Sequence, residues 1–150
     1  MRLRTVTGLG VSGVLVLATL AFAQSANEEV SFPEAYRDGV HYATVTRGNI
    51  REEIFTSPEA VAAAREGRTF PDGTVIMMED YRGDELHRYI IMEKRAQWTS
   101  VSEAGAWLFR EFAPDRSPNG SEDGSRCASC HQSQAANDFV FTTRQMREHN

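Results

Sequence analysis

The two cysteines of the chain stand three positions apart and are followed directly by a histidine, in the run Cys127-Ala128-Ser129-Cys130-His131. On a helical turn, side chains three residues apart lie on the same side, so both sulfurs can reach the vinyl-derived edges of one porphyrin. The adjacent imidazole can then offer a nitrogen to the iron. C-x-x-C-H is the attachment pattern of c-type haem. The sequence therefore predicts one covalently bound haem c, with Cys127 and Cys130 as anchors and His131 as the iron ligand.

Other uses of two cysteines stay open as alternatives. A redox dithiol is expected in a βαβ context, and a disulfide across so tight a loop removes little chain entropy. A zinc site would need further ligands, and His41, His87 and His149 are scattered without ligand spacing. The rival to haem is thus a domain in which the two cysteines form a disulfide or bind another metal.

Residues 1–23 have the layout of a secretory signal. They contain no acid, begin with Arg2 and Arg4, run apolar from residue 9 to residue 20, and end on Ala-Phe-Ala. The apolar run is shorter than the ~20 residues that a membrane-spanning helix needs. We therefore expect a signal peptide over residues 1–23, cleavage after Ala23, and a periplasmic or secreted protein.

The remaining residues, 24–150, are expected to form one haem c domain. They hold 14 basic and 21 acidic residues, a net charge of −7 with histidine neutral. So acidic a chain is a poor match for nucleic acid, which requires a basic face, and no nucleic-acid partner is expected. About 127 residues suffice for one hydrophobic core. Residues 24–31 are small and polar, which predicts a flexible lead-in.

Stretches upstream of the motif are rich in β-branched and aromatic residues and are separated by turn residues, which is typical of strands. They cover residues 41–46, 50–56, 74–81, 85–95 and 104–112. Short turns at Gly48-Asn49 and Arg82-Gly83-Asp84 favour pairing of consecutive strands. The predicted fold class is α+β, mainly antiparallel β: a β-sheet meander with a few short helices, carrying the haem on its C-terminal C-x-x-C-H segment.

Two helices are predicted beside these strands. One runs over residues 58–66, where Ser57 can cap its beginning and Gly67 can end it. A shorter one covers residues 32–36, with a proline at a tolerated first position. Residues 114–126 contain almost nothing apolar, so they are expected to form an exposed loop that leads into the haem motif.

Several further motifs accompany the cysteines, and together they resemble the cytochrome P-460 family, whose relatives include the cytochromes c′-beta. They are Phe-Pro at 32–33 with Tyr36, FPDGT at 70–74, MEKR at 92–95, CASCH at 127–131 and NDFVFT at 137–142. The resemblance implies a mainly antiparallel β fold, a homodimer, and one haem c. It also implies a five-coordinate iron with His131 on the proximal side and an open distal face.

The family resemblance offers two activities. Cytochrome P-460 proper oxidises hydroxylamine with a haem cross-linked to a lysine, whereas the c′-beta relatives lack that link and bind nitric oxide in an apolar pocket. Met78 is the best match to the cross-linking position, and a thioether cannot form an amine link. Lys94, the only lysine, falls one strand later. The sequence thus favours binding and redox handling of small nitrogen oxides, with nitric oxide ahead of hydroxylamine.

The sixth iron position decides between these functions and a plain electron carrier. We expect Met146 to pack rather than to bind iron, and Met77, Met78 and Met92 to form an apolar wall. Phe70 and Phe55 are nominated as an aromatic lid over the iron.

Glu103 is nominated as a proton relay, which hydroxylamine oxidation would need. A six-coordinate electron-transfer cytochrome, with an electron-transfer partner of its own, and a lysine-linked hydroxylamine oxidase remain the alternatives.

Overall fold

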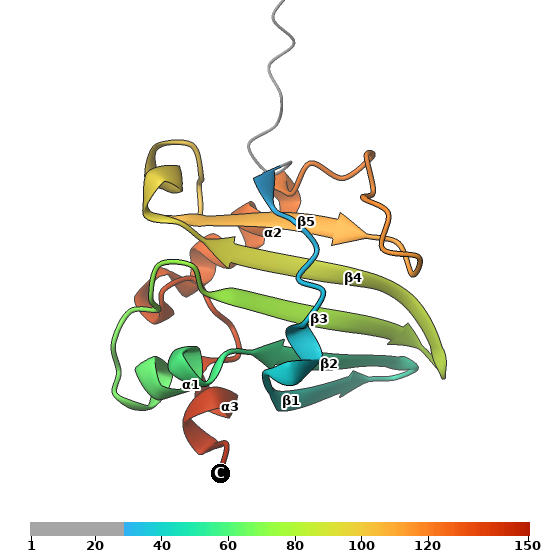
Figure 1. The fold of residues 1–150 in the computed structure, drawn as a ribbon, viewed down its shortest axis with the longest axis horizontal. Coiled ribbons are helices and arrows are strands. Elements are labelled where there is room, and N and C mark those ends of the chain that lie inside the picture. The colour runs from blue at the N-terminus through green and yellow to red at the C-terminus, as the bar shows by residue number, and fades with distance from the viewer. Residues whose placement is uncertain (1–28) are drawn as a thin grey trace, which may run out of the picture.

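The computed structural model describes residues 29–150, which are built around a five-stranded antiparallel sheet (Figure 1). The strands lie side by side in chain order, so each pairs with its neighbour in sequence. They are β1 (Val40–Arg47), β2 (Ile50–Thr56), β3 (Val75–Arg82), β4 (Glu85–Lys94) and β5 (Trp107–Phe112). The predicted α+β class and antiparallel meander are confirmed. The predicted signal peptide, residues 1–23, lies outside the described residues.

Helix α1 (Pro58–Arg65) forms where the sequence predicts it. The Ser57 hydroxyl accepts a hydrogen bond from the backbone N–H of Ala60 at 3.2 Å, and Gly67 follows with a φ of +68°. The helix predicted at residues 32–36 is displaced toward the C-terminus. Pro33 begins a turn there, and the 3₁₀ helix η2 (Tyr36–Asp38) follows it.

The sequence did not indicate three short helices after the fourth strand. These are η3 (Ala96–Ser100), η4 (Gln132–Asn137) and α3 (Thr143–Glu148). The last strand begins at Trp107 rather than at residue 104, because Gly105 adopts a φ of +64° and makes a turn. No helix in residues 29–150 is long and apolar enough to cross a membrane.

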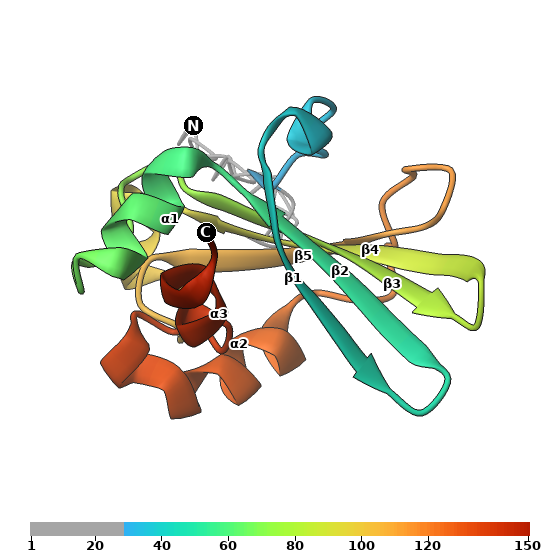
Figure 2. The same ribbon diagram turned by 90° about the horizontal axis from the view of Figure 1, so that it is seen from below.

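The two faces of the sheet are covered by different parts of the chain. Helices α2 (Ser125–His131) and α3 lie on one face, and the N-terminal segment with η2 crosses the other (Figure 2). Val30 in that segment is fully buried, so the predicted flexible lead-in is wrong for its described part. Because strand side chains alternate between faces, Met77 packs beneath the N-terminal segment and Met78 faces the helices.

The segment between β5 and α2 is largely exposed, as predicted, yet it is tied to the sheet. Pro118 forms a bridge with Phe112, and the Asn119 amide donates to a carboxylate oxygen of Glu111 at 2.7 Å. Gly124, with a φ of +76°, then turns the chain into α2. These contacts bring the C-x-x-C-H motif back over the sheet.

Candidate functional site

A cavity of about 630 Å³ lies between the helix-covered face of the sheet and the C-terminal segment. This volume is in the range of cofactor and small-molecule sites. The strands contribute an apolar wall: Val45, Ile54, Ile76, Met78, Ile90, Met92 and Phe109. The C-terminal segment contributes the opposite side: Cys127, Cys130, His131, Val140, Phe141, Thr142 and Gln145. The predicted haem motif therefore faces an apolar sheet surface.

Helix α2 carries both cysteines on one short turn beside the cavity. Ala128 is buried against the core and anchors the helix, whereas Cys127 is half-buried and Cys130 exposed. Both are free thiols. Burial raises the pKa of the Cys127 thiol, so it stays protonated at neutral pH. Two thiols three positions apart on one helix and lining an apolar cavity are the groups that attachment of a haem c would require.

His131 is held in one tautomer. Its Nδ1 lies 2.6 Å from the carbonyl oxygen of Phe139, and since a carbonyl can only accept, Nδ1 donates and Nε2 keeps its lone pair. Burial lowers the pKa of His131, although the bond to Phe139 acts in the opposite direction. The neutral imidazole with a free Nε2 is the form that binds a metal ion.

Two aromatic rings fix the plane of that imidazole. The Phe109 ring lies 4.8 Å from it at an angle of 54°, and the Phe141 ring lies 4.9 Å from it at 83°. Phe109 is buried in the sheet, whereas Phe141 is 48% exposed and stands at the rim of the cavity. Sequence reasoning missed both residues, together with the carbonyl of Phe139, because their roles depend on contacts across the fold rather than on spacing.

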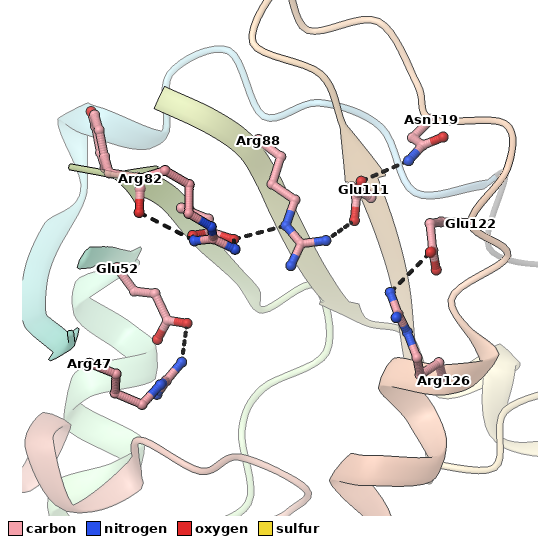
Figure 3. A network of polar contacts seen from close by, with 10 residues as sticks. Arg47, Glu52, Arg82, Arg88, Glu111, Asn119, Glu122 and Arg126 are labelled. Atoms are coloured by element: carbon pink, nitrogen blue, oxygen red, sulfur yellow. Dashed lines mark hydrogen bonds and ion pairs between the residues drawn. The ribbon is translucent and has the colours of Figure 1, made fainter. Parts of the chain in front are cut away.

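Five charged side chains also line the cavity, and Figure 3 shows how they pair with one another and with neighbours outside the lining: Arg47, Glu52, Arg88, Glu111 and Arg126. Arg88 donates to Asp80 at 2.9 Å and to Glu111 at 2.6 Å, and Arg82 also pairs with Asp80. Arg47 pairs with Glu52, and Arg126 pairs with Glu122. A lining that combines apolar and charged side chains suits haem, whose ring is apolar and whose propionates are charged.

The structure places two of the sequence nominations away from the cavity. Phe70 is buried with its ring 5.9 Å from that of Trp107, and it does not line the cavity. Phe55 lies on the opposite face of the sheet, against Tyr36. Neither ring is therefore positioned as a lid over His131, because strand parity turns Phe55 away and core packing holds Phe70.

Of the other nominated residues, some line the cavity and some lie outside it. Met78 and Met92 line the cavity, whereas Met146 is fully buried in the core. Glu103 is exposed, outside the cavity lining, and accepts from Gln132 at 3.4 Å. Of the described histidine, cysteine, aspartate and glutamate side chains, no three gather as a metal site.

Lys94 also lies outside the cavity lining. Its Nζ donates to a carboxylate oxygen of Asp138 at 2.6 Å and to the Phe70 carbonyl at 2.9 Å. These bonds hold the amine between Asp138, in the loop that follows η4, and Phe70, in the segment before β3, so its position differs from that of Met78 in the cavity wall.

The comparisons with known proteins agree with this geometry. The family model of cytochrome P460 matches residues 33–142, which include all five strands, the cavity wall and the C-x-x-C-H motif. A search of the curated proteins finds no match to this chain. Haem with its iron is the cofactor that this family implies, and the cysteines, the imidazole and the apolar cavity fit it. The chain therefore belongs to the cytochrome P460 family.

Proposed function

We propose that this protein is an exported cytochrome with a single haem c that binds small nitrogen oxides, nitric oxide first among them, at a five-coordinate iron. The observation that carries the proposal is the contrast between the two sides of the cavity. One side presents the neutral imidazole of His131, and the sheet opposite presents hydrocarbon and thioether groups. An apolar distal wall of this kind leaves room for a small neutral ligand.

Each residue of the site has its own task in this proposal. Cys127 and Cys130 hold the porphyrin through thioether bonds, and His131 Nε2 binds the iron. The Phe139 carbonyl keeps Nδ1 protonated and so keeps Nε2 available. When bound, the haem supplies an iron with an open coordination position. Ile54 and Ile76 in the wall exclude water and disfavour charged ligands.

The positions of the carboxylates and of Lys94 favour nitric oxide binding over hydroxylamine oxidation. Oxidation requires a proton acceptor near the substrate, yet Glu52 and Glu111, the carboxylates that line the cavity, are each paired with an arginine. Glu103 lies outside the lining, and the Lys94 amine is engaged by Asp138. We therefore infer that the haem has no lysine cross-link and that nitric oxide binding is the principal function.

A six-coordinate electron carrier is the second candidate, and a specific observation favours it. The thioethers of Met78 and Met92 line the same cavity as His131, and methionine is a common sixth ligand of cytochromes. The spectrum of the ferrous protein separates the two functions. A high-spin spectrum that changes on nitric oxide addition supports the first, and a low-spin spectrum that does not respond supports the second.

The test uses the full chain exported by a host with haem-attachment machinery. The purified protein is expected to carry haem that withstands acid–acetone extraction, and ferrous protein is expected to bind nitric oxide. The variant His131→Ala should keep its thioether bonds but change spin state. His87→Ala, at an exposed position of β4 that does not line the cavity, is the matched control and should leave the spectrum unchanged. A colourless wild-type protein, or an unchanged His131→Ala spectrum, would refute the proposal.

Location and assembly are part of the proposal. Residues 1–23 are proposed to direct export and to be removed, which the mass of the purified chain tests. The family resemblance supports a homodimer, which sedimentation tests. The acidic net charge supports an electron-transfer partner with a basic face.

A further inference from the structure

We propose that Lys94 is a positioning residue for His131: its ion pair with Asp138 holds the strained loop whose carbonyl orients the imidazole. The inference rests on the proposed role of His131 as the iron ligand. It assigns a structural task to the only lysine of the sequence, which does not line the cavity.

The ion pair is largely shielded from water. The side chains of Lys94 and Asp138 are each 15% exposed, and Nζ lies 2.6 Å from Oδ2. The same carboxylate oxygen accepts the backbone N–H of Phe70 at 2.7 Å, while the Phe70 carbonyl accepts from Nζ at 2.9 Å. Because each charge has both an ionic partner and a backbone partner, loss of one member leaves a poorly solvated charge behind.

The loop beside this pair has an uncommon backbone conformation. Asp138 has a φ of +52° and Phe139 a φ of +64°, so two consecutive residues other than glycine are left-handed. For a bulky residue such as phenylalanine this is a genuine outlier, and it persists only where the surroundings enforce it. A backbone bond from Phe139 to Gln134 at 2.8 Å and the ion pair on Asp138 supply that enforcement.

The strained residue makes the bond that orients His131. The Phe139 carbonyl accepts the Nδ1 proton at 2.6 Å, and Asp138 immediately precedes it. Without the ion pair, the loop can relax toward negative φ, which turns that carbonyl away from the imidazole. A ligating histidine that loses its second hydrogen bond becomes a weaker base, so the bond to the iron weakens.

The experiment measures the iron–histidine stretching band of the ferrous holoprotein by resonance Raman spectroscopy, together with the midpoint potential. Lys94→Met is expected to shift the band to lower frequency, broaden it and raise the potential. Lys94→Arg, which keeps a charged donor, should return both values toward wild type. Arg95→Met is the matched control, since it removes the neighbouring Arg95–Glu93 pair without touching Asp138.

The outcomes separate the two proposals. An unchanged band and potential in Lys94→Met would overturn the positioning role and leave His131 as the ligand. Absence of an iron–histidine band in high-spin ferrous wild-type protein would refute the ligand itself, and with it the inference; in a low-spin protein, the midpoint potential alone tests the positioning role. If Lys94→Met does not accumulate as holoprotein, the isosteric Asp138→Asn supplies the same measurement, with the same shift expected and an unchanged band again overturning the role.

Discussion

Gly105 lies under the ring of Phe139, and replacing it with alanine should loosen the loop that orients His131. A Cβ added at Gly105 would lie 2.5 Å from Cε2 and 3.1 Å from Cδ2 of that ring, far inside van der Waals contact. The backbone there also has a φ of +64°. The substitution therefore carries a conformational cost and a steric cost together.

The two costs can be separated with Gly67, whose φ of +68° is nearly the same and whose added Cβ would meet nothing within 4 Å. The left-handed conformation costs an alanine about 1–2 kcal/mol. Forcing the Phe139 ring aside adds about 1–3 kcal/mol. Gly67→Ala is thus expected to lose about 1–2 kcal/mol of unfolding free energy and Gly105→Ala about 2–5 kcal/mol.

Two measurements are made on both holoprotein variants. Denaturant titration gives the free energy of unfolding, and resonance Raman spectroscopy of the folded ferrous protein gives the iron–histidine band. Gly105→Ala should shift the band as Lys94→Met does, because the displaced Phe139 ring takes its carbonyl along, whereas Gly67→Ala should not. Equal losses of stability in the two variants would refute the packing argument. A wild-type band in a destabilised Gly105→Ala protein would show that the ring and the carbonyl move independently.

Two further predictions concern buried or networked carboxylates. Glu79, which is 2% exposed, accepts hydrogen bonds from Tyr36, Arg37 and Tyr81. Glu79→Gln should therefore lower the unfolding free energy by about 1–3 kcal/mol in denaturant titrations. An unchanged unfolding free energy would contradict the role of this network. Burial raises the pKa of Glu53, but hydrogen bonds led by Thr44 outweigh it and hold that pKa below its ordinary 4.5. The folded state therefore gains stability from ionised Glu53 above about pH 4.5 and loses it as the pH falls further. Glu53→Gln should thus weaken the fall of the urea unfolding midpoint between about pH 6 and pH 3. A fall equal to that of the wild type would contradict the assignment.

Local sequence determined much of the framework. Turn residues and β-branched runs predicted all five strands, and Ser57, Pro58 and Gly67 predicted α1 almost to the residue. These predictions succeed because capping, backbone φ and side-chain alternation act within a few neighbouring residues. The C-x-x-C-H motif is equally local, since its chemistry depends on the spacing along one helical turn. Val30 and η2 depart from expectation because packing against the opposite sheet face, rather than local composition, orders them.

The surroundings of His131 were decided by the tertiary structure. Phe109 and Phe141 reach the imidazole from β5 and from the C-terminal segment, while Phe70, nominated from its motif, packs on Trp107 instead. Lys94 meets Asp138 across 44 positions of sequence. Side-chain type and spacing do not encode which face of a strand meets which loop. That choice follows from burying two hydrophobic clusters on opposite faces of one sheet at once.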